Sequence, residues 1–178
     1  MSIVVQDQIK LHRFAVWLIV RSLASKMGLQ KYVLAGSYRR GAWWCNDIDL
    51  LIPINSASEG EGIKANLKKL GWTLSHHRKN DNEIVFSTQF LKETKKGIIV
   101  LDLFLAPPGS WGNALLFTTG PKSFNSTIRS DILGLGYSWT TNPRFFTRIL
   151  DNTQISFDNE RSALFFINKK WIPPHKRV

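Results

Sequence analysis

The sequence contains a single cysteine, Cys45, and lacks any long hydrophobic run. One cysteine excludes an internal disulfide framework and is typical of proteins in a reducing compartment. The longest apolar run extends from Phe14 to Val20, which is far shorter than the roughly 20 residues that span a bilayer. It also lacks the cleavage site of a signal peptide. We therefore expect a soluble, intracellular chain, cytoplasmic, nuclear, nucleoid-associated or viral, with no membrane as partner.

Acidic residues are also scarce. The 178 residues include 24 lysines and arginines but only 13 aspartates and glutamates, which gives a net charge of +11. Residues 1–108 carry 15 basic and 9 acidic side chains, and residues 109–178 carry 9 and 4. The excess of positive charge is therefore spread along the chain, and it favours a polyanion with a phosphate backbone as partner. An anionic membrane is the alternative, but no polybasic run or lipidation motif supports it.

The hydrophobic pattern predicts an α+β fold in two lobes, divided at Pro107–Gly109. The expected helices are Ile9–Met27, Glu61–Leu70, Lys122–Leu133 and a short one that is capped by Asp158 and ends near Ile167. The expected strands are Tyr32–Ala35, Asp47–Ile54, Trp72–His77, Ile84–Leu91, Ile98–Leu105, Phe145–Leu150 and Gln154–Phe157. Ile84–Leu91 and Ile98–Leu105 flank a polar turn, so we expect them to form a hairpin.

Three aspartates are the candidate chemical groups. Asp47 and Asp49 lie two residues apart on an expected strand, so their side chains point to the same face. Such carboxylates repel each other unless a cation neutralises them or one stays protonated, and hard divalent ions prefer oxygen ligands. Asp102 lies inside a strongly apolar strand, where a carboxylate is costly unless it is paired or binds a metal. The alternative to metal binding is a purely structural Asp102, which lies at a strand end and reaches solvent or an arginine.

A Gly36-Ser37 step precedes these aspartates and ends an expected strand. A strand that turns there into a helical turn presents backbone N–H groups to an anion. Arg40 follows closely and could add a charge-assisted contact to a phosphate. The sequence thus places a candidate phosphate site beside the candidate metal site.

The order of these motifs resembles the nucleotidyltransferase superfamily and, within it, the family X DNA polymerases of the DNA polymerase beta type. The first matching segment reads GSYRRG and ends in DIDLLI, between Gly36 and Ile52. The second reads ALLFTTGPKSFN, from Ala114 to Asn125, and is followed by Arg129. The third, WIPPHKR, spans Trp171–Arg177 and is similar to the family's closing motif.

This resemblance implies a palm at residues 1–108 with a mixed sheet, and a small α+β thumb at residues 109–178. Only 35 residues precede Gly36, so we expect neither a lyase nor a fingers domain, as in the small viral members of the family. The implied activity is DNA-directed DNA polymerisation, in which a monomer adds dNMP from dNTP to the primer 3′-hydroxyl of gapped or primed DNA during repair. Template-independent transfer, transfer to an RNA end, and a non-catalytic DNA-end-binding module are the alternatives.

The resemblance also implies roles for individual residues. Asp47, Asp49 and Asp102 would hold two Mg²⁺ ions, for which Mn²⁺ could substitute. The implied nucleotide contacts are Gly36, Ser37, Arg40, Phe117, Thr118, Gly120 and Asn125, and the implied DNA contacts are Lys122 and Arg129.

Some positions depart from the family pattern. Val100 stands where relatives have a basic residue that orients the third carboxylate, and Phe117-Thr118 replaces a Tyr-Phe pair. The turn at Gly120–Pro121 is cis in the family, and proline lowers the cost of a cis bond. Trp43 and Trp44 could stack on a base or pack into the core.

Overall fold

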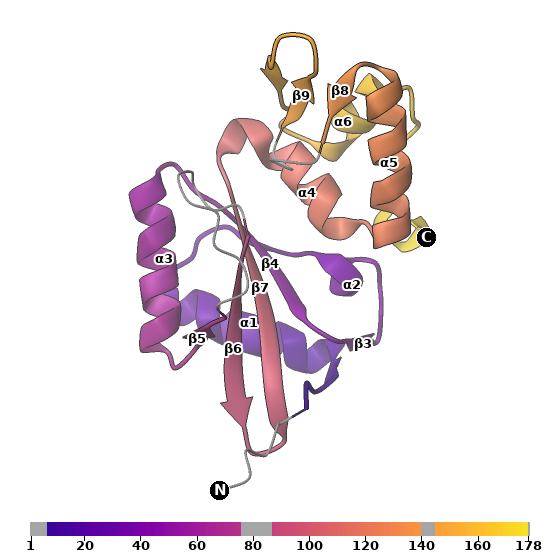
Figure 1. Cartoon of the computed structure of the whole chain (residues 1–178). Helices are drawn as coiled ribbons and strands as arrows, with labels where there is room; N and C mark the ends of the chain where they lie inside the picture. Colours follow the sequence, from indigo (N-terminus) through magenta and orange to yellow (C-terminus); the bar gives the residue numbers. More distant parts are fainter. Residues whose placement is uncertain (1–6, 76–86, 140–144, 178) are drawn as a thin grey trace, which may run out of the picture.

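The computed structural model describes residues 7–75, 87–139 and 145–177 (Figure 1). These residues form an α+β protein with a mixed sheet and six α-helices. None of the described helices is both long and apolar enough to cross a bilayer.

A five-stranded sheet is the centre of the first lobe, which we define as residues 7–106. Its strand order is β2-β4-β7-β6-β5. The strands are β2 (Val33–Leu34), β4 (Ile48–Pro53), β5 (Thr73–Leu74), β6 (Ser87–Thr94) and β7 (Gly97–Ala106). Strands β4 and β7 pair in parallel and the other pairs are antiparallel, which makes the sheet mixed. Because β4 and β7 are interior strands covered on both faces, both are almost continuously apolar.

The expected hairpin is confirmed. Strands β6 and β7 are joined by a tight turn that pairs Thr94 with Gly97. Residues 84–86 of the expected strand lie outside the described residues, as do residues 76 and 77 beyond β5.

One face of the sheet is covered by α1 (Arg13–Met27) and α3 (Ala57–Lys69), as Figure 1 shows. Every second residue of the central strands points into this core: the members are Ile48, Leu50 and Ile52 of β4 and Ile99, Leu101, Leu103 and Leu105 of β7. The intervening residues point to the opposite face, where Leu51 and Phe104 pack against the second lobe. Asp49 and Asp102 belong to this second set, so their side chains also lie on the face away from α1 and α3.

Two expected helix starts are wrong. Helix α1 ends at Gly28 as predicted, in the left-handed conformation, but it begins at Arg13 and not at Ile9. The preceding residues are held in strand β1 (Leu11–His12), which pairs with β3 (Trp44–Cys45). Helix α3 begins at Ala57 and not at Glu61, because the Ser56 side chain accepts the N–H of Glu59 and caps it.

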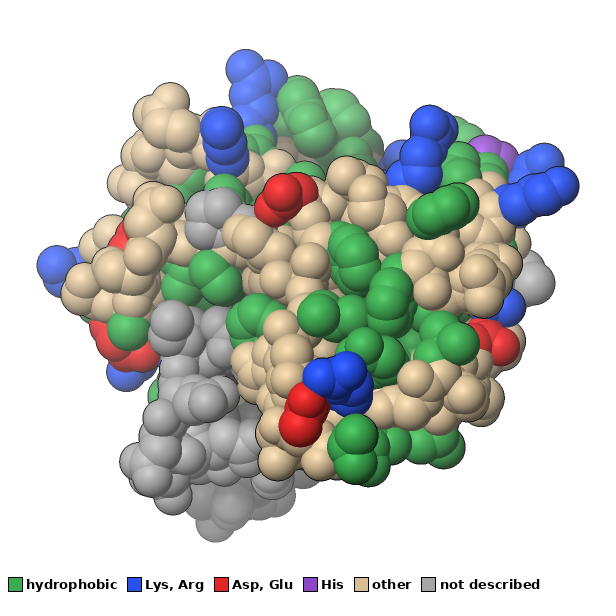
Figure 2. Space-filling model, turned by 90° about the horizontal axis from the view of Figure 1, so that it is seen from above, with side chains coloured by type: hydrophobic (Ala, Val, Ile, Leu, Met, Phe, Trp, Pro, Cys, Tyr) green, Lys and Arg blue, Asp and Glu red, His purple; other side chains and the backbone are tan. Residues whose placement is uncertain are grey.

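The second lobe, residues 108–177, has a hydrophobic core of its own. Its elements are α4 (Trp111–Thr119), α5 (Lys122–Gly134), β8 (Tyr137–Ser138), β9 (Phe146–Arg148), β10 (Gln154–Ile155), α6 (Glu160–Phe166) and 3-10 turns at Pro108–Ser110 and Pro174–Lys176. Helix α5 agrees with its prediction, and its Phe124, Ile128 and Ile132 are buried. Lysine and arginine side chains project around the face seen in Figure 2, and hydrophobic side chains gather near its centre.

Three predictions for the second lobe need correction. Helix α4 was not expected as a separate element. The cap of α6 is Asn159 and not Asp158, because Asn159 Oδ1 accepts the N–H of Ser162 at 2.9 Å. The Asn113 side chain fixes the chain just before this point by accepting the N–H of Phe157. Strands β9 and β10 are shorter than predicted.

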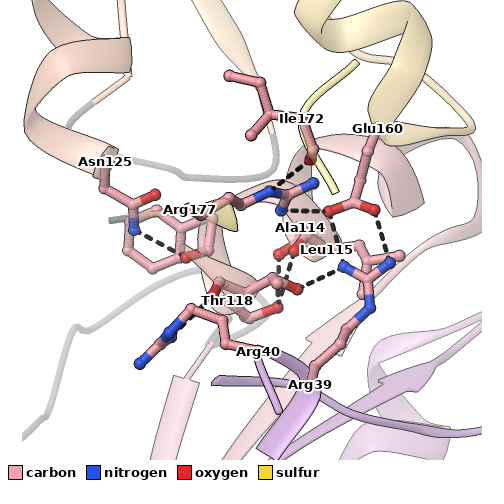
Figure 3. Close-up of polar contacts among 11 residues, drawn as sticks. Arg39, Arg40, Ala114, Leu115, Thr118, Asn125, Glu160, Ile172 and Arg177 are labelled. Carbon is pink, nitrogen blue, oxygen red and sulfur yellow. Dashed lines mark hydrogen bonds and ion pairs between the residues drawn. The ribbon is translucent and has the colours of Figure 1, made fainter. Parts of the chain in front are cut away.

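A buried ion-pair network joins the two lobes through Glu160 (Figure 3). Arg39, at the end of α2 (Gly36–Arg39), donates to both carboxylate oxygens of Glu160 at 2.8 and 2.7 Å. Arg177 donates to the same carboxylate at 2.7 Å, and its side chain is fully buried. Arg39 and Arg40 also donate to the side chain and the carbonyl of Thr119. One acidic residue therefore fixes α2, α6 and the C-terminal segment together.

We expect Glu160→Gln to reduce the free energy of unfolding by on the order of 3 kcal/mol, because it leaves the buried Arg177 without its counter-charge. Urea unfolding followed by circular dichroism measures this. Glu61→Gln is the matched control, since Glu61 forms an exposed pair with Lys64 and its loss should cost less than about 1 kcal/mol. Equal effects of the two substitutions would contradict a special role for Glu160.

Candidate functional site

A cleft between the sheet and the second lobe gathers all the predicted site residues. It has a volume of about 520 Å³. The first lobe contributes Gly36, Ser37, Arg40, Asp47, Asp49 and Asp102, and the second lobe contributes Phe117, Thr118, Gly120, Lys122, Asn125 and Arg129. Trp44, Asn46, Phe104 and Pro121 complete the lining. A larger hollow of about 1150 Å³ lies elsewhere, between α1, β2 and α3, and none of the predicted site residues lines it.

The aspartates lie together because β4 and β7 are parallel neighbours. Asp49 pairs directly with Asp102 in the strand register, and both lie on the face turned away from α1 and α3. Asp47 precedes β4 by one residue and lines the same cleft. The strand pairing therefore brings together carboxylates that are more than 50 residues apart in the sequence.

Glycine is required at position 36. Gly36 opens α2 with a φ of +50°, in the left-handed region that favours glycine. A Cβ at this position would overlap the carboxylate of Asp49. The predicted turn from a strand into a helical segment is confirmed, and its close approach places the Gly36 backbone against Asp49.

Burial raises the pKa of Asp49 from an ordinary value of 3.8 to about 8. The negative charges of Asp47 and Asp102 act in the same direction, and the positive charge of Arg40 opposes them. The ionised form of Asp49 is thus disfavoured at neutral pH without a further cation. Carboxylate oxygens crowded in this way suit a hard divalent ion such as Mg²⁺. In residues 7–75, 87–139 and 145–177, no three His, Cys, Asp or Glu side chains are arranged as a group that could hold a metal ion.

Gln89 was not predicted as a site residue. Its Nε2 donates to Asp102 Oδ1 at 3.1 Å, from the position directly opposite on β6. The sequence contains a signal for this contact in the hairpin turn. A turn that pairs Thr94 with Gly97 also pairs Gln89 with Asp102 in the antiparallel register. Val100, where the resemblance implies a basic residue, is buried and apolar. An amide from the neighbouring strand thus holds the third carboxylate here.

Residues on both walls of the cleft contain buried polar atoms. Among the described residues, Ser37 Oγ, Asn125 Oδ1 and Arg129 Nε are buried without a hydrogen-bond partner. The other end of the Asn125 amide donates to the carbonyl of Phe117 at 2.8 Å, which fixes its orientation. Buried polar atoms are normally paired, so these atoms fit a polar ligand between the lobes.

Gly120 also has a steric role, because a Cβ there would overlap Asn125 Oδ1. Thr118 lines the cleft, but its hydroxyl already donates to the carbonyl of Ala114 at 2.8 Å.

The expected cis bond at Gly120–Pro121 is wrong, since no described peptide bond is cis. The bond is trans, the isomer that X–Pro bonds intrinsically prefer, and Pro121 is the extended N-cap residue of α5.

Trp43 and Trp44 are not core residues, because their side chains are 67% and 61% exposed. Cys45, which follows Trp44 in the sequence, is fully buried and packs in the core. A comparison of the sequence with models of known protein families finds no match.

We expect the metal-free protein to lose stability as the pH rises from about 4 to about 8. Native Asp49 keeps its proton until its raised pKa of about 8, whereas the unfolded chain releases it near 3.8. The native state therefore binds more protons in this window, and rising pH favours unfolding. Asp49→Asn should remove this part of the slope, and Mg²⁺ should reduce it in the wild-type protein.

Urea unfolding at pH 5 and pH 8, with EDTA or with Mg²⁺, measures both effects. Asp158→Asn is the control, since Asp158 is exposed and lies outside the cleft. If Asp49→Asn kept the wild-type dependence on pH, the assigned origin of the raised pKa would be incorrect.

Proposed function

We propose that this chain is a DNA polymerase of family X type, which transfers dNMP from dNTP to a primer 3′-hydroxyl. The observation that carries the proposal is the direct pairing of Asp49 with Asp102 on a cleft floor, opposite a wall of Lys122, Asn125 and Arg129. Residues of the first two sequence motifs that resemble family X line the two sides of this cleft. The net charge of +11 supports a nucleic-acid partner.

The reaction joins the primer 3′-oxygen to the α-phosphorus of the dNTP. The bond between the α- and β-phosphates breaks, pyrophosphate leaves, and the hydroxyl proton is released. Two Mg²⁺ ions bound by Asp47, Asp49 and Asp102 would stabilise the charge on the attacking and leaving oxygens. The protein's part is mainly positioning, because phosphoryl transfer needs little covalent participation from side chains.

The first-lobe residues suit the triphosphate end of the nucleotide. Gly36 and Ser37 of α2 line the cleft, and the buried Ser37 hydroxyl has no partner among the described residues. Arg40 lines the same wall and already donates to the carbonyl of Thr119. This contact ties the proposed phosphate-binding turn to α4, so nucleotide binding and the approach of the second lobe are mechanically linked.

The second-lobe residues suit the base and the DNA. Asn125 lines the cleft and has a buried acceptor oxygen without a partner among the described residues, and the Arg129 guanidinium lies 5.7 Å from the Phe117 ring centre. Lys122 is exposed one helical turn before Asn125. Together these side chains provide an acceptor and two cations beside the proposed nucleotide.

Extension of a labelled primer on DNA with a one-nucleotide gap tests this function. We expect addition of the complementary nucleotide with Mg²⁺ or Mn²⁺. Asp49→Asn and Asp102→Asn should each reduce the rate by at least about 1,000-fold, because several kcal/mol of transition-state stabilisation is lost. Asp158→Asn should extend the primer at the wild-type rate.

Other outcomes would replace the proposal. Addition of any nucleotide without a template would indicate a terminal transferase. Extension of RNA ends alone would indicate an RNA nucleotidyltransferase. DNA binding without any extension would indicate a non-catalytic DNA-end-binding module.

Gln89 should act as a positioning residue for Asp102. Gln89→Met removes the donor at similar size, and we expect kcat to fall roughly ten-fold because one hydrogen bond to a charged group is lost. The KM for dNTP should stay unchanged, since Gln89 does not line the cleft. The control is Thr88→Val on the same strand, where the buried Thr88 hydroxyl has no partner among the described residues. An equal loss in both variants would indicate general damage to β6 and not a specific effect on Asp102.

A further inference from the structure

Large aromatic side chains are exposed on one surface that the proposed chemistry does not use. They come from the first turns of α1 and from Trp43 and Trp44 at the start of β3, two segments that β1 brings side by side. Phe14 is 59% exposed, and Trp43 and Trp44 are more exposed still. We call Phe14, Trp17, Trp43, Trp44 and the intervening His12 the aromatic platform.

The rings of the platform pack against one another. His12 stacks on Trp43 with ring centres 5.9 Å apart and meets Trp44 edge-on at 5.3 Å. Phe14 stacks on Trp17 at 5.7 Å. The main chain is also fixed, because Arg13 N–H donates to the carbonyl of Trp43 at 2.8 Å. Ordered rings of this kind bind planar ligands at little cost in conformational entropy.

Cationic side chains lie among the rings. The Arg13 guanidinium lies 4.9 Å from the Tyr38 ring centre and 5.7 Å from that of Trp43. Arg21 lies 5.0 Å from the Trp17 ring centre. Helix α1 contains no acidic residue. The surface therefore combines exposed π-faces with positive charge, which is complementary to unpaired nucleotides and their phosphates.

The aromatic platform is continuous with the carboxylate cleft. Trp44 lines the cleft, whereas its neighbour Trp43 lines a hollow of about 580 Å³ together with His12, Phe14 and Trp17. The α2 turn also borders both, through Ser37 on one side and Tyr38 on the other. A strand that leaves the cleft past Trp44 reaches the hollow directly.

We propose that the aromatic platform binds a single-stranded DNA segment, with unpaired bases stacked on Trp43 and its neighbouring rings. The choice of DNA as partner rests on the proposed function. The platform supplies a grip on bases that is independent of sequence, because every base offers a π-face. Arg13 and Arg21 supply the contacts to phosphate.

Fluorescence anisotropy with a labelled 20-nucleotide oligo-dT, in EDTA and without dNTP, tests the proposal. We expect Trp43→Ala to weaken binding roughly ten-fold, within the range measured for loss of a base-stacking residue. Trp43→Phe should retain most of the affinity because it keeps a ring. The matched control is Phe165→Ala, which removes a ring that is 80% exposed on the second lobe. Trp43→Ala should also leave the binding of a blunt duplex unchanged.

Electrostatic and stacking contacts can be separated by salt. Arg21→Gln should lower the slope of log affinity against log salt by roughly 0.7, whereas Trp43→Ala should lower affinity with the slope unchanged. Wild-type affinity for oligo-dT in Trp43→Ala would overturn the proposal. If Trp43→Ala instead abolished self-association in sedimentation velocity while oligo-dT binding persisted, the platform would be a protein contact.

The assay needs neither metal nor nucleotide, so its result is separate from that of primer extension. Oligo-dT binding that depends on Trp43, without any primer extension, would support the platform and overturn the polymerase proposal. Primer extension together with oligo-dT binding that Trp43→Ala leaves unchanged would support the polymerase proposal and overturn the platform.

Discussion

The parallel pairing of β4 with β7 is the constraint on which the rest of the site depends. It sets Asp49 opposite Asp102 and turns both away from the core under α1 and α3. A shift of one residue in either strand would point its carboxylate into that core, where a charge is prohibitive. The apolar residues on either side of each aspartate therefore determine the position of the site as firmly as the aspartates themselves.

The second constraint is the junction between the lobes. Glu160 binds Arg39 from α2 and Arg177 from the C-terminal segment, while Arg40 holds the carbonyl of Thr119 (Figure 3). The α2 turn that begins beside Asp49 thus ends in contacts with the second lobe. The same short helix thus borders the carboxylates, the junction and the aromatic platform.

Much of this arrangement could be predicted from the sequence, where local patterns decide it. Alternation along the two apolar strands predicts the face of each aspartate, and the polar turn predicts the β6–β7 hairpin. The start of α1 could not be predicted, because the pairing of β1 with the distant β3 overrides helix periodicity. Helix α3 includes Gly60, a poor helix former that is retained where a Cβ would press on Leu105. The contact between Gln89 and Asp102 could be predicted only from the register of the hairpin, which becomes certain once the turn is known.

The central claim is that the carboxylate cleft holds divalent ions for phosphoryl transfer. Titration with Mn²⁺, in which electron paramagnetic resonance counts the free ion, tests it most directly because it requires no catalysis. With a non-hydrolysable dNTP analogue present, the wild-type protein should bind two Mn²⁺ ions, and Asp49→Asn should bind fewer or bind them far more weakly. Asp158→Asn should match the wild type. Equal Mn²⁺ binding by Asp49→Asn and the wild type would contradict the account.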